Sequence, residues 1–148
     1  MEAPASAIWM HGTTGTGVQV PVNLGLANQI SVAKGDKLNW YQYQQSSGGT
    51  DGGMNLTFEN GWQLNGSCTT CSGQPGAAVD QNGVPVDRWG GNAAWTWRIA
   101  DLSSFAGHTV TGAQLIKSAI APGGDWDLLF SFISVSHANG QVDTIYDA

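Results

Sequence analysis

Aromatic side chains are the residues of this chain whose spacing most clearly suggests a chemistry. Trp95 and Trp97 are two positions apart, so a β-strand would place both indoles on one face, about 7 Å apart. Such a pair could stack on successive rings of an extended sugar chain, with Asn, Gln and Asp side chains meeting the hydroxyl groups. Burial in the core is the alternative, and we favour it because Ile99 continues the same face and Trp is highly buried on average.

Four other aromatic residues are candidate ligand contacts. Trp62 and Trp89 lie in glycine-rich polar sequence, where no strand pattern demands their burial, and they are the better candidates for an exposed site. Tyr41 and Tyr43 form a pair at strand spacing on the face opposite Trp40, and this pair could either pack that second face or bind a ligand there. The indoles expected to be structural are those of Trp9, Trp40 and Trp126.

Residues suited to acid–base catalysis are few. The sequence contains no Gly-x-Ser-x-Gly elbow, no His-Glu-x-x-His pair and no phosphate-binding glycine loop, so no motif names a reaction. If the protein is an enzyme, its candidate proton-transfer groups are His11, His108 and Asp127, because imidazole titrates near neutral pH and Asp127 adjoins a predicted strand. We favour a non-catalytic protein.

The sequence has one pair of cysteines, Cys68 and Cys71. A redox-active pair at this spacing opens a helix, which the surrounding glycines and proline prevent, and a structural zinc ion needs four ligands. We therefore predict a local disulfide that pins a long loop, with reduced, inert thiols as the alternative.

Asp80, Asn82 and Asp87 could offer oxygen ligands to a calcium ion. Their spacing lacks the full pattern of a helix-loop-helix calcium site, so we prefer to interpret them as turn-forming residues. No cofactor is expected.

Composition narrows the class of partner. The 148-residue chain has five Lys and Arg against eleven Asp and Glu, a formal net charge of −6. Five scattered cations are too few for a nucleic acid or an anionic membrane surface, so we exclude both and expect a neutral glycan or other small molecule, with oligomers possible. The Gly-, Asn-, Ser- and Thr-rich composition is typical of secreted β-proteins and predicts an extracellular location, although no signal peptide is visible in this sequence.

Short strands must position these residues, because Asn-Gly and Gly-Gly pairs recur and no helical period is sustained. The clearest predicted strands cover 127–136, 141–146, 37–44 and 94–99, and further ones 7–10, 18–20, 29–32, 56–59 and 110–120, with one helical turn at 101–105. Eight to ten short strands predict a single all-β domain over 1–148, either an antiparallel, jelly-roll-like sandwich or a closed barrel. The Gly- and Asn-rich stretch at about 61–92 is expected to be a long loop with few core residues that faces the ligand.

Alternation predicts the faces of the strand at 127–136. One face is expected to carry Leu128, Phe130 and Phe132, and the other Leu129, Ile133 and Val135. Because both faces are apolar, this segment is predicted to be a central strand covered on both sides.

The opening Ile8-Trp9-Met10-His11-Gly12, followed by Val18-Gln19-Val20, resembles a family of small uncharacterised bacterial β-proteins that begin with Trp-x-His-Gly. The likeness extends to Lys34-Gly35, Asn39-Trp40-Tyr41 and Ile133-Ser134-Val135, while 68–92 resembles an insertion. This resemblance implies a β-fold and either a site or a structural corner near Trp9 and His11. It implies no activity, because none is attached to the family.

Three functions are consistent with these features. The first, which we favour, is a lectin-like, non-catalytic carbohydrate-binding domain. The second is a small β-barrel enzyme with acid–base chemistry on an apolar or aromatic metabolite in an aromatic-lined cavity. The third is a surface protein that self-associates through exposed aromatic residues.

Overall fold

A computed structural model of the chain describes residues 4–12, 18–44, 51–67, 73–88, 94–118 and 126–147. Its elements in these ranges are β1 (Ile8–Gly12), β2 (Val20–Leu24), β3 (Ile30–Ser31), β4 (Lys37–Gln44), β5 (Gly52–Phe58), β6 (Gln63–Leu64), β7 (Trp95–Asp101), the 3₁₀ helix η1 (Ser103–Phe105), β8 (Thr109–Lys117), β9 (Trp126–Ser136) and β10 (Val142–Tyr146).

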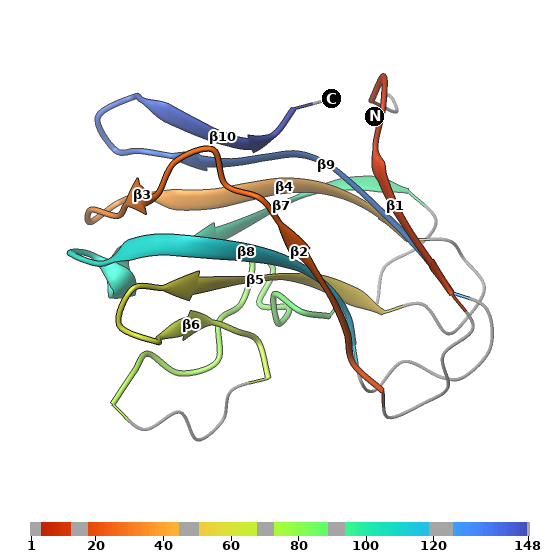
Figure 1. Cartoon of the computed structure of the whole chain (residues 1–148), viewed down its shortest axis with the longest axis horizontal. Coiled ribbons are helices and arrows are strands. Elements are labelled where there is room, and N and C mark those ends of the chain that lie inside the picture. Colours follow the sequence, from red (N-terminus) through yellow and green to blue (C-terminus); the bar gives the residue numbers. More distant parts are fainter. Residues whose placement is uncertain are drawn as a thin grey trace.

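The strands form two antiparallel sheets that lie face to face (Figure 1). Sheet A has the order β1-β9-β4-β7, with β10 also paired to β9, and sheet B has the order β2-β8-β5-β6, with β3 also paired to β8. This arrangement of eight strands, with β3 and β10 added, is the strand order of a jelly roll. The predicted all-β antiparallel sandwich is confirmed, and the alternative of a closed barrel was wrong.

Local sequence explains most of these elements. The alternation that predicted a strand at 37–44 gives β4 with the same bounds, and the predicted helical turn at 101–105 contains η1. There the carboxylate of Asp101 accepts the backbone N–H of Ser103 at 2.9 Å, and Gly107 follows with a φ of +86° that favours glycine. The two-residue strand β6 was not predicted, because it lies in the Gly- and Asn-rich stretch that was expected to be a loop.

The core lies between the two sheets and is mainly apolar. Its apolar side chains include Met10, Leu38, Trp40, Leu128, Phe130, Ile133 and Val135 from sheet A, and Ile30, Met54, Leu56, Phe58 and Leu115 from sheet B. Leu64 and Val86, inside the stretch expected to be a loop with few core residues, are also fully buried. The described part of this stretch therefore packs against the sandwich at these two positions.

Two short strands share one edge of β9. β1 pairs with 126–130 and β10 with 133–136, and between them Phe132 has a φ of +48°, a left-handed conformation that non-glycine residues seldom adopt. The register between β9 and β4 shifts at the same point, which marks a β-bulge.

This bulge reverses the alternation along β9. Leu128 and Phe130 face the core before it, and Ile133 and Val135 face the core after it. Phe132 instead lies against aromatic rings on the outer face. The expectation that Ile133 and Val135 lie opposite Leu128 was wrong, because strict alternation does not anticipate an extra residue in one strand.

Candidate functional site

The outer face of sheet A carries a cluster of aromatic rings. Tyr41 of β4 pairs with Trp97 of β7, and Tyr43 pairs with Trp95. The ring centroids lie 4.8 Å apart for Tyr41 and Trp97, 5.0 Å for Tyr41 and Trp95, and 5.6 Å for Tyr43 and Trp95. Phe132 of β9 joins the group 6.0 Å from Trp97. We call these five residues the aromatic cluster.

The structure corrects the favoured expectation that Trp95 and Trp97 lie in the core. Both indoles face outward, and Trp97 is 38% exposed while Trp95 is half-buried. Tyr41 lies beneath them and is only 3% exposed. Ile99 was taken to indicate burial in the core because it makes this face of β7 apolar. The outward rings bury much of their surface against one another, so this apolar face does not have to lie in the core.

The opposite face of β7 places a charged residue in the core. The fully buried Arg98 donates from Nε to the carboxylate of Asp80 at 2.7 Å and from Nη1 to Oε1 of Gln42 at 3.2 Å, and its guanidinium carbon lies 4.9 Å from the ring centre of Trp40. Burial disfavours the charged form and lowers the pKa of Arg98, against the opposing effect of Asp80. This pair fastens the segment that contains Asp80 to the inside of sheet A.

The calcium candidates form turns and hydrogen bonds within the protein. Asp80 Oδ1 accepts the backbone N–H groups of Asn82 and Val84, so both oxygens of this carboxylate already have protein donors. Asp87 accepts the hydroxyl of Ser67. Among the described residues no group of three His, Cys, Asp or Glu is placed to hold an ion. The second oxygen of Asp87, Oδ1, is buried without a hydrogen-bond partner among the described residues, and the calcium site stays a prediction.

A small hollow of about 140 Å³ lies beside the aromatic cluster. It is open to solvent, and its wall consists of Trp97, Phe132, Ile133, Ser134, Val142, Thr144, Tyr146 and Asp147. Aromatic carbon therefore adjoins three residues with hydroxyl groups and a carboxylate. This combination of apolar surface and a few polar groups is characteristic of sites for small polar ligands.

A second exposed indole lies on the same outer face. Trp9, which was expected to be structural, is 61% exposed. Its Nε1–H donates to Asp127 Oδ1 at 2.7 Å, and Nδ1 of His11 lies 2.7 Å from the same oxygen. The rings of Trp9 and His11 are 4.9 Å apart. Because His11 and Asp127 are paired residues of β1 and β9, the register brings these two candidate residues together.

The other candidates lie elsewhere. His108 follows η1, where its Nδ1 is 3.2 Å from Glu59 and its ring is 4.5 Å from that of Trp62. Trp62 also packs edge-on against Phe105, so its indole is half-buried rather than free on a loop. Trp89, Cys68 and Cys71 lie outside the described residues.

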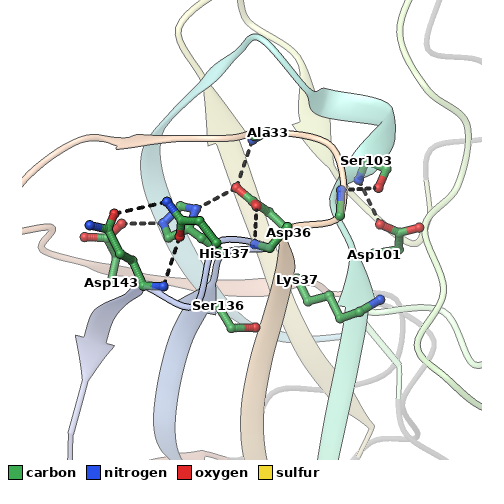
Figure 2. Close-up of polar contacts among 12 residues, drawn as sticks. Ala33, Asp36, Lys37, Asp101, Ser103, Ser136, His137 and Asp143 are labelled. Carbon is green, nitrogen blue, oxygen red and sulfur yellow. Dashed lines mark hydrogen bonds and ion pairs between the residues drawn. The ribbon is translucent and has the colours of Figure 1, made fainter.

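The sequence did not predict one polar cluster, which is built around His137, the third histidine of the chain. Figure 2 shows His137 between two carboxylates: Nδ1 lies 2.6 Å from Asp36 and Nε2 lies 2.6 Å from Asp143. Asp36 also accepts the backbone N–H groups of Ala33 and Ala138. The cluster ties the turn before β4 to the β9–β10 hairpin, and we call it the His137 clasp. The three charged residues are too far apart in sequence to form a motif.

Hydrogen bonds and nearby charges shift the pKa values of His137 and Asp36 in this clasp. Burial alone would lower the pKa of His137, but hydrogen bonds and charges from Asp143 and Asp36 outweigh it, so the pKa lies above its ordinary value. Burial alone would raise the pKa of Asp36, but the hydrogen bonds from Ala33, Ala138 and His137 lower it. Because each of its ring nitrogens contacts a carboxylate, His137 has no free ring nitrogen for a substrate, so we interpret the clasp as structural.

Fold and site together define a class: an antiparallel β-sandwich with jelly-roll strand order and an aromatic outer face on one sheet. No protein-family model matches the chain, and no curated protein matches it significantly. Jelly rolls occur in lectins and also in viral capsids, so the function has to be argued from the site. No helix within the described ranges is long and apolar enough to cross a membrane.

Proposed function

We propose that this protein is a non-catalytic carbohydrate-binding domain that binds a neutral glycan on the outer face of sheet A. The observation that carries the proposal is the exposed indole of Trp97 beside a hollow of about 140 Å³ whose wall includes Ser134, Thr144 and Asp147. A sugar ring has an apolar C–H face and a rim of hydroxyl groups. The indole can stack on the C–H face, and the hydroxyl and carboxylate oxygens can form hydrogen bonds with the hydroxyl groups of the sugar.

The charge of the molecule favours a neutral ligand. The formal net charge is −6, and two of the five basic residues, Arg98 and Lys117, are fully buried. Asp147 borders the hollow and Asp127 lies on the same outer face near Trp9. An anionic glycan would therefore meet carboxylates where it needs cations. We also propose that the protein is extracellular and that Cys68 and Cys71 form a disulfide. Thiol alkylation followed by mass spectrometry of the protein from its native source tests that disulfide.

The glycan proposal is tested by titrating tryptophan fluorescence with soluble neutral polysaccharides, alongside affinity electrophoresis in gels that contain them. We expect Trp97→Ala to weaken binding at least about tenfold, the equivalent of about 1.4 kcal/mol. Trp97→Phe should keep part of the affinity because it retains an aromatic face. Trp62→Phe is the matched control, since it removes an indole that packs near η1, away from the aromatic cluster.

Two results would contradict the proposal. One is the absence of any response by the unmodified protein across glucans, mannans, xylans and galactans. The other is concentration-dependent dimerisation in sedimentation velocity that Trp97→Ala abolishes, with no glycan bound. That second result would favour the self-associating surface protein instead.

A further inference from the structure

We infer that the binding face extends across sheet A from Trp95 to Trp9, and that its ligand is a single soluble chain of several neutral sugars lying across the strands. This inference rests on the proposed function and adds to it the class and direction of the ligand. It also assigns a binding role to Trp9, at the opposite edge of the sheet from β7.

The strand register aligns four apolar side chains. Trp9 of β1 pairs with Leu129 of β9, Leu129 pairs with Tyr43 of β4, and Tyr43 pairs with Trp95 of β7. Directly paired residues place their side chains on the same face of a sheet. These four residues therefore form one row across four neighbouring strands, which we call the cross-strand row. Neighbouring strands are about 4.8 Å apart, so the row spans about 14 Å, enough for several linked sugar rings.

The Trp9 indole is held in place although it is exposed. Its one polar atom is satisfied by Asp127 at 2.7 Å, and the His11 ring lies on one side of it at 4.9 Å with a tilt of 33°. With 61% of the residue exposed, apolar carbon is presented to solvent in a defined orientation. An aromatic side chain ordered before binding lowers the entropic cost of stacking a ligand on it.

The rings do not share one plane, and this favours a single soluble chain over a flat crystalline polysaccharide as the ligand. The planes of Tyr43 and Trp95 differ by 47°, and those of Tyr41 and Trp97 by 32°. Neighbouring strands in a sheet are also rotated by about 20–25° relative to each other. A flat crystalline polysaccharide would meet only part of such a surface. A single chain that turns along its length can follow it.

The test uses calorimetric titrations with linear β-1,4-linked oligomers of glucose, mannose or xylose, from two to six units long. The unmodified protein should bind longer oligomers more tightly until the chain spans the row. Trp9→Ala should weaken binding of the longest oligomers about tenfold and leave the two-unit oligomers unchanged. Trp9→Phe should keep most of the gain with length. Trp62→Phe is again the control for loss of an indole elsewhere.

Asp127→Asn is the second variant, because it keeps the volume of the side chain and weakens the hold on Trp9. It should lower affinity for long oligomers only. If Trp9→Ala and Asp127→Asn lower affinity equally at all lengths, or at none, the inference is overturned while the proposed function stands. Binding to microcrystalline cellulose as tight as to soluble oligomers would overturn the assignment of a single chain. If the unmodified protein binds no oligomer, the proposed function itself fails.

Discussion

At the scale of single residues, Arg98 shows how the protein buries a charge. Its guanidinium is satisfied by the carboxylate of Asp80, by Gln42 and by the carbonyl of Pro85 at 2.9 Å. A buried pair of this kind contributes little net stability compared with well-packed apolar residues, but it is costly to break. The pair therefore serves mainly to define where the segment around Asp80 attaches.

We expect Arg98→Met to lower the free energy of unfolding by about 3–5 kcal/mol, because it leaves the carboxylate of Asp80 buried without its cation. The measurement is urea denaturation followed by circular dichroism. The double variant Arg98→Met with Asp80→Asn should lose less than the sum of the two single variants. Simple additivity would contradict the coupling.

Phe132 carries backbone strain at the bulge of β9. At a φ of +48° a side chain with a Cβ costs about 1–2 kcal/mol relative to glycine. Phe132→Ala removes the ring and keeps the strain, whereas Phe132→Gly removes both. We therefore expect the glycine variant to be about 1 kcal/mol more stable than the alanine variant in urea denaturation. Equal stability, or the reverse order, would show that the bulge is not strained.

At the scale of elements, the His137 clasp connects the turn before β4 to the β9–β10 hairpin, and its stabilisation depends on pH. The pKa of His137 is raised in the folded state, so its contribution is fully present below about pH 6.5 and is lost as the pH rises through the folded value. The pKa of Asp36 is lowered, so its contribution is present above about pH 3.8 and is lost as the pH falls through the folded value. The clasp is strongest in mildly acidic solution.

We accordingly predict that His137→Gln is most destabilising near pH 5–6, and that its difference from the unmodified protein shrinks at higher pH. Thermal melts between pH 5 and pH 9 measure this difference. Asp143→Asn removes one carboxylate and should shift the loss to lower pH. A difference that stays constant over the whole range would show that the clasp does not titrate.

At the scale of the whole molecule, charge predicts how binding responds to salt. The net charge is −6, Arg98 and Lys117 are buried, and the proposed ligand is neutral. Affinity for a bound neutral oligosaccharide should change by less than about twofold between low and high salt, because no ion pairs form on binding. Polygalacturonate, which is anionic, should bind weakly at every salt concentration. A steep loss of affinity with salt would instead indicate a charged ligand.

Short-range pattern determined the class of fold. Turn-forming Asn-Gly pairs and two-residue alternation are local properties of the chain, so the all-β class, the bounds of β4 and the strand over most of 127–136 followed from the residues alone, whereas the choice of a sandwich over a closed barrel did not. The same alternation correctly placed Tyr41 with Tyr43, and Trp95 with Trp97, on shared faces. The alternation of residues along a strand predicts which side chains share a face, because successive side chains of a pleated strand point to opposite faces.

Tertiary structure alone decided which face is covered and which residues meet. Trp97 faces outward because Arg98, its neighbour, has a buried partner 18 residues away in Asp80. Trp9 joins the row with Tyr43 and Trp95 only through the register of β9 between β1 and β4. Such contacts depend on the pairing of distant segments, and the outward position of Phe132 depends on an extra residue in β9. Neither leaves a periodic mark in the sequence.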